Sequence, residues 1–147
     1  MKKLTLTLAF ALITLFATAQ IKEVEASKKP TVIGEVKQMG VFICELAHYD
    51  DSKEYLITFR NAEYKTIIDI KSISFEGTQD DLDNLYNLFS SVLNGEKGNE
   101  KIIEIGTDKI RIINSKIMGT TSIYVYVDNK GYFMLDKKWL NKLFNKS

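Results

Sequence analysis

The sequence has few of the residues that carry catalysis, metal binding or cross-links: one cysteine, one proline and one histidine among 147 residues. The lone Cys44 excludes an intramolecular disulfide, and the lone His48 excludes every site that needs two imidazoles. On an extended strand these two residues would lie about 13 Å apart, too far for a thiolate–imidazole pair. We therefore expect a buried, unreactive cysteine, and the sequence predicts no catalytic residue, metal site or cofactor.

Motifs that bind phosphates or dinucleotides are also missing, as is the nucleophile elbow of hydrolases. Acidic residues cluster at 50–54 and 80–83, but neither cluster has the spacing and the glycine of a calcium loop. In Asp128-Asn129-Lys130-Gly131 a lysine stands where such a loop needs an oxygen ligand. A solvated turn, a helix N-terminus and a hairpin tip explain the three segments. Whether the chain is an enzyme stays open, and the sequence favours a non-catalytic protein.

An excess of one charge is lacking too, because 20 basic residues face 19 acidic ones, for a net charge of +1. A nucleic-acid binder needs a basic field that displaces counterions from phosphates, so we expect no nucleic-acid partner. The same balance argues against electrostatic docking on an anionic membrane.

The first nineteen residues have the order of a secretory signal peptide. Lys2 and Lys3 precede the apolar run 4–16, and Ala17-Thr18-Ala19 is a small-residue cleavage site. The run is shorter than the ~20 residues of a membrane-spanning helix, so an uncleaved anchor is the weaker alternative. We expect cleavage after Ala19, no stable membrane insertion afterwards, and a periplasmic or secreted protein of net charge near −1.

The remainder fits a flexible segment, 20–30, and one domain, 31–147. Short runs rich in Ile, Val, Tyr and Phe alternate with turn residues, a pattern typical of strands. We expect strands near 31–37, 41–49, 54–60, 64–75, 101–106, 109–117, 121–127 and 131–135.

Two helices interrupt the strands. Thr78 and Asp81 resemble a capping box ahead of an apolar face over 82–93, and Asp136 is the expected N-cap of a short second helix. The predicted fold is α+β, mainly antiparallel, in the order ββββα-ββββα, with both helices packed on the sheet. Residues 55–61 loosely resemble 123–129, so an internal duplication is an open alternative.

Hairpin registers predict which faces are buried. A two-residue loop at Asn61-Ala62 would place Tyr64 opposite Phe59, and the following strand would need a bulge near Lys71-Ser72 to change its apolar phase. A turn at Thr107-Asp108 would gather the isoleucines of its hairpin on one face. These isoleucines are Ile103, Ile105, Ile110 and Ile112.

The last hairpin differs, because a turn at Asn129-Lys130 leaves both of its faces apolar. Tyr124, Tyr126 and Phe133 would then share one face. Either this face is covered by other elements, as in sheets backed by helices, or it is an open aromatic patch. Because tyrosine is concentrated at protein interfaces, these three residues are the candidate binding site.

The leading functional hypothesis is an exported, non-catalytic domain that binds an envelope or extracellular protein, as an inhibitor or accessory factor. An alternative is a carrier that encloses a small apolar ligand between the sheet and the 82–93 helix. An envelope hydrolase that uses carboxylates is the least favoured. The sequence does not assign an oligomeric state.

Overall fold

The computed structural model describes residues 29–146, so the predicted signal peptide, 1–19, and residues 20–28 lie outside it. The chain is of the α+β class, with the predicted order ββββα-ββββα. Its first half comprises β1 (Thr31–Gln38), β2 (Val41–His48), β3 (Glu54–Arg60), β4 (Ile70–Glu76) and α1 (Gln79–Leu93). Its second half comprises β5 (Glu100–Ile105), β6 (Asp108–Ile117), β7 (Thr120–Val127), β8 (Gly131–Asp136) and α2 (Lys137–Leu143).

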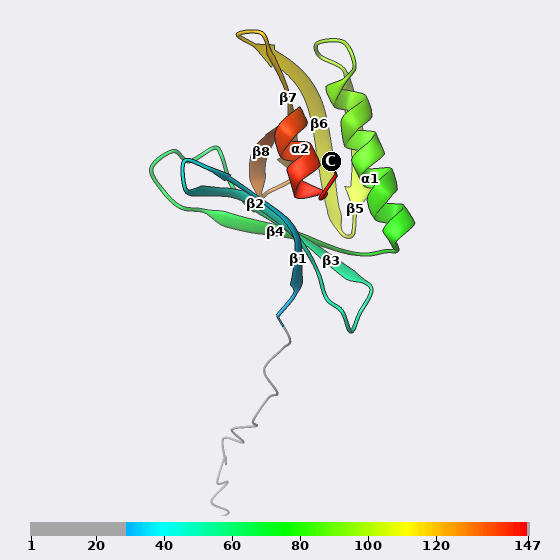
Figure 1. Ribbon diagram of the computed structural model, residues 1–147. Helices are drawn as coiled ribbons and strands as arrows, with labels where there is room; N and C mark the ends of the chain where they lie inside the picture. Colours follow the sequence, from blue (N-terminus) through cyan, green and yellow to red (C-terminus); the bar gives the residue numbers. More distant parts are fainter. Residues whose placement is uncertain (1–28, 147) are drawn as a thin grey trace, which may run out of the picture.

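Each half forms its own antiparallel four-stranded sheet, with the strands in chain order. We call β1–β4 the first sheet and β5–β8 the second sheet. Although α1 follows the first sheet, it packs against β6 and β7 of the second, while α2 packs against β1, β2 and β8 (Figure 1). The rings of Phe59 and Phe133, one from each sheet, have centroids 4.8 Å apart. The two sheets and both helices therefore share one core.

The helix starts are those that the sequence predicts. At α1 the Asp81 backbone N–H donates to Thr78 Oγ1 at 3.3 Å, and the Thr78 N–H donates to Asp81 Oδ2 at 2.7 Å, which completes a capping box. At α2 the Asp136 side chain accepts the backbone N–H of Trp139 at 2.7 Å. The apolar face of α1 is buried through Leu82, Leu85, Phe89, Val92 and Leu93.

The predicted connection from β3 to β4 is wrong. Arg60 pairs with Ile70, so β4 begins only there, and residues 61–69 form a longer connection instead of a two-residue loop. Tyr64, which we expected opposite Phe59, is 47% exposed, and Ile68 in the same connection is 74% exposed. The predicted bulge at Lys71-Ser72 is absent, since β4 pairs with β3 in unbroken register along its whole length. The bulge was predicted so that apolar residues before and after 71–72 could lie on the same face. Because β4 begins only at Ile70, this requirement does not arise.

Two hairpins of the second sheet differ from their predicted registers, with unequal consequences. In β5–β6, Ile105 pairs with Asp108, a shift of two residues that keeps the isoleucines on their predicted face. In β7–β8, Val127 pairs with Gly131, so the register is shifted by one residue. A one-residue shift moves every side chain to the other face. Phe133 therefore points into the core, 1% exposed, and Tyr132 takes the outer position.

Candidate functional site

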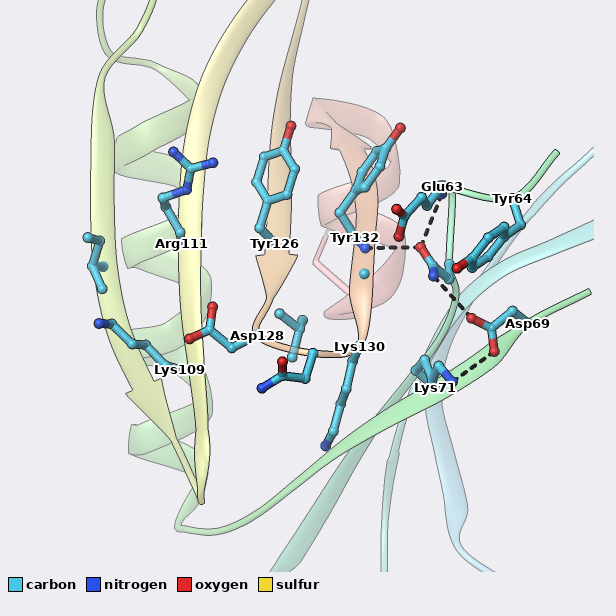
Figure 2. A pocket seen from close by; sticks show the side chains of 15 residues that line it. Glu63, Tyr64, Asp69, Lys71, Lys109, Arg111, Tyr126, Asp128, Lys130 and Tyr132 are labelled. Atoms are coloured by element: carbon cyan, nitrogen blue, oxygen red, sulfur yellow. Dashed lines mark hydrogen bonds and ion pairs between the residues drawn. The ribbon is translucent and has the colours of Figure 1, made fainter.

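Three tyrosines lie on the outer side of the second sheet, away from its helices. Along β7, Ile123 and Val125 are fully buried, while the alternating Tyr124 and Tyr126 remain partly exposed. Tyr132 of β8 joins them: its ring centroid is 5.1 Å from that of Tyr126 and 5.9 Å from that of Tyr124. We call these residues the tyrosine face. In Figure 2, Tyr126 and Tyr132 stand on the near side of the sheet and the helices lie behind it.

Charged and apolar side chains continue this face across the neighbouring strands. The registers place Ile102, Arg111, Tyr126 and Tyr132 in one row across all four strands. The Arg111 guanidinium lies over the Tyr126 ring, 4.9 Å from its centroid, a favourable cation–π geometry. The Arg111 Nη1 atom is 3.6 Å from Glu100 Oε2. The aromatic surface thus has a charged, solvent-exposed border.

Where the tyrosine face meets the first sheet, the surface is hollowed into a cleft of about 730 Å³ (Figure 2). Its charges are mixed, so the cleft has no strong preference for an anion or a cation. The cationic side chains are Lys71, Lys109, Arg111 and Lys130, and the anionic ones are Glu63, Asp69 and Asp128.

Asn61 builds the corner of this cleft. The residue is 2% exposed. Its Oδ1 accepts the backbone N–H groups of Glu63 at 3.0 Å and Tyr132 at 3.2 Å. Its Nδ2 donates to Asp69 Oδ2 at 3.0 Å. A Cβ atom on Gly131, where φ is +96°, would overlap the Asn61 side chain. Asparagine and glycine at these positions therefore fix connection 61–69 against β8 and orient the backbone that carries Tyr132.

On the other side of the cleft, a lysine forms hydrogen bonds that connect three elements. Lys130 Nζ donates to the Ser72 carbonyl oxygen at 2.9 Å and to Asp108 Oδ2 at 2.8 Å. These bonds join the β7–β8 connection to β4 and to the start of β6. The lysine that argues against a calcium loop in the sequence thus forms a hydrogen bond between the two sheets.

Two ionisable groups of the cleft have shifted pKa values. Hydrogen bonds from Asn61 and then Lys71 hold the pKa of Asp69 below its usual range, so this carboxylate is ionised and already partnered. Burial, followed by the nearby Tyr126, raises the pKa of Tyr132. Its phenol therefore stays neutral at physiological pH and remains a hydrogen-bond donor.

A second concavity adjoins the cleft, with which it shares Tyr64, and lies between the β1–β2 turn, β2, the end of β3, connection 61–69, β8 and α2. Its volume is about 460 Å³. We call it the apolar groove, because most of its lining is aliphatic or aromatic. The lining residues are Gln38, Met39, Val41, Ile43, Arg60, Ala62, Tyr64, Lys65, Phe133, Met134 and Trp139.

Three ionisable side chains outside the cleft are in states unfavourable for catalysis. Cys44 is fully buried, as expected, and burial raises the pKa of its thiol to about 12, so no thiolate forms at neutral pH. The pKa values of Asp81 and Asp83 are lowered, chiefly by hydrogen bonds from Thr78 and Lys146, whereas a general acid needs a raised pKa.

No cluster of His, Cys, Asp and Glu within residues 29–146 is arranged to hold a metal ion. In the same residues, no helix has the length and apolarity needed to cross a membrane.

Of the three predicted binding residues, the structure brings Tyr124 and Tyr126 together and separates Phe133 from them, because Phe133 lies on the core side of β8. Sequence reasoning missed Tyr132 through the one-residue register error. It also missed Asn61, although an asparagine directly after an alternating apolar strand is a usable signal for a side chain that holds a turn. Comparison with known proteins found no matching family model, no matching curated protein and no matching solved structure.

Proposed function

We propose that this chain is an exported, non-catalytic binding module that contacts a partner protein of the envelope or the extracellular space through its tyrosine face. The observation that carries this proposal is the shared, partly exposed position of Tyr124, Tyr126 and Tyr132. Their rings touch one another on a sheet face that no helix of the described residues covers.

The chemistry of the face supports a protein partner. Tyrosine and arginine are enriched in the regions of interfaces that contribute most binding energy, because each offers a large rigid surface and a polar end. Within residues 29–146, the three phenol hydroxyls have no hydrogen-bond partner, so they are free to bond to another chain. Arg111 and Glu100 form the polar border that a desolvated aromatic centre needs.

Export is proposed from the sequence alone, through the cationic start, the apolar run and the small residues before Gln20. A non-catalytic role is supported by the inert thiol and by the lowered carboxyl pKa values.

The test is crosslinking in living cells followed by purification of the tagged full-length protein. The double variant Tyr124→Glu/Tyr126→Glu places two charges at the centre of the face without changing a core residue. Tyr49→Glu is the matched control, since Tyr49 is a partly exposed tyrosine at the β2–β3 connection. We expect the wild type and the control to capture the same specific protein, and the double variant to lose it while keeping its thermal unfolding midpoint. Equal capture by all three chains would contradict the proposal, and so would the absence of any specific partner.

A further inference from the structure

The apolar groove has exposed apolar side chains. Met39 stands at the tip of the β1–β2 turn with a positive φ of 50° and is 99% exposed, and Val41 beside it is 43% exposed. Tyr64 of connection 61–69 also lines the groove and is 47% exposed. A volume of about 460 Å³ is within the range of small-molecule sites. The groove is thus large enough for a hydrocarbon chain and has walls that favour one.

The charges around the groove have one sign. Arg60, at the end of β3, and Lys65, in the connection, are the charged residues of the lining, and no aspartate or glutamate lies among them. Arg60 Nη2 donates to the Lys65 carbonyl oxygen at 3.5 Å, a long bond. Neither side chain has a carboxylate within ion-pair distance in residues 29–146. Two unneutralised cations at the edge of an apolar surface are complementary to a negatively charged head group.

We infer that the apolar groove binds a single-chain carboxylate amphiphile of the fatty-acid type. The hydrocarbon chain lies along Met39, Val41 and Trp139, and the carboxylate accepts hydrogen bonds from Arg60, with Lys65 beside it. The groove adjoins the tyrosine face, because Met134 pairs with Tyr124 and Tyr64 also lines the cleft, but its lining includes none of the three face tyrosines. The inference does not depend on the function proposed for that face. The groove also lies away from α1, where the sequence analysis placed an enclosed ligand.

The chain itself supplies the probe, because Trp139 is its only tryptophan and lines the groove. Purified full-length protein is titrated with octanoate, decanoate and dodecanoate below their micelle concentrations while tryptophan fluorescence is recorded. We expect saturable changes, with the dissociation constant falling about fourfold for each added methylene, as burial of one methylene predicts. Decanol has the same chain without the charge, and decyltrimethylammonium has the opposite charge. We expect decanoate to bind about tenfold more tightly than decanol, and the cation to bind most weakly.

Two arginine variants locate the head group. Arg60→Gln removes the charge at the groove, and we expect it to weaken decanoate about tenfold while leaving decanol unchanged. Arg111→Gln is the matched control, because Arg111 borders the tyrosine face, and it should change neither ligand. Lys65→Gln, in an exposed connection, repeats the test if Arg60→Gln fails to fold.

Three results would overturn the inference. The first is the absence of a saturable fluorescence change with every carboxylate. The second is equal affinity for decanoate and decanol in the wild type, which would show apolar contact without recognition of charge. The third is binding to phosphatidylglycerol vesicles with no binding of free decanoate, which would assign the cations to a lipid surface.

Discussion

Asn114 of β6 supplies the sharpest test of how the second half is held together. Its amide Nδ2 donates to three carbonyl oxygens at the end of α1: those of Val92 and Leu93, both at 2.8 Å, and that of Gly95 at 3.1 Å. The residue is 2% exposed. A helix end leaves its last carbonyls without donors, and here one strand side chain satisfies them. Asn114 therefore connects the C-terminal end of α1 to the second sheet by hydrogen bonds.

The substitution Asn114→Leu keeps the number and branching of the side-chain heavy atoms and removes the donor. The Val92 carbonyl still accepts the Gly95 N–H at 3.2 Å, whereas the Leu93 and Gly95 carbonyls lose the donor that the structure gives them. Each buried carbonyl left without a partner costs about 1–3 kcal/mol, so we expect the loss of both donors to lower the free energy of unfolding by about 2–6 kcal/mol.

Urea unfolding followed by circular dichroism measures this change. Asn94→Ala is the control: Asn94 is an exposed amide at the same helix end, and its loss should cost less than about 0.5 kcal/mol. A loss below about 1 kcal/mol for Asn114→Leu would refute the reasoning, because it would mean that the helix end does not depend on the strand amide.

Two further predictions concern the cleft and the first helix. Gly131→Ala should cost at least about 2 kcal/mol more than Gly119→Ala, since both glycines have positive φ but only the first would overlap another side chain, that of Asn61; equal losses in urea unfolding would contradict this. The hydrogen bonds from Thr78 lower the pKa of Asp81 in the folded state, so its contribution is present above the ordinary value of 3.8 and is lost as pH falls below it. The stability difference between wild type and Asp81→Asn should therefore shrink from neutral to acidic pH in thermal unfolding, and a difference independent of pH would be inconsistent with the capping box.

Element type and order were readable from the sequence because they depend on local chemistry. Two-residue alternation predicted the strands, and three- and four-residue spacing predicted α1. The N-caps Thr78 and Asp136 were predicted because each short side chain bonds to backbone only a few residues away. The segment 64–69 was assigned wrongly, since its isoleucines fit a strand pattern while the chain there is held by Asn61 and by contacts with β8.

The candidate site depended on register, which is less local. The sequence placed Tyr124 and Tyr126 on one face, and this is independent of how β7 pairs, because residues two apart always share a face. Whether Phe133 or Tyr132 lies on the same face as these two tyrosines depends on the length of the β7–β8 connection. A difference of one residue in that length exchanges the two. The positive φ at Asn129 and at Gly131 accommodates that connection, and the Asn61 side chain packs against it.

By itself, therefore, the sequence determined the class of the fold, the order of its elements and the alternation within each strand, because these are set by backbone hydrogen bonding and by side-chain pattern over a few residues. Only the tertiary structure decided that each helix packs against strands of the other half, that Tyr132 joins Tyr124 and Tyr126 on a partly exposed face, and that Arg60 and Met39 border one groove. Those outcomes depend on contacts between residues far apart in the chain, which no local pattern encodes.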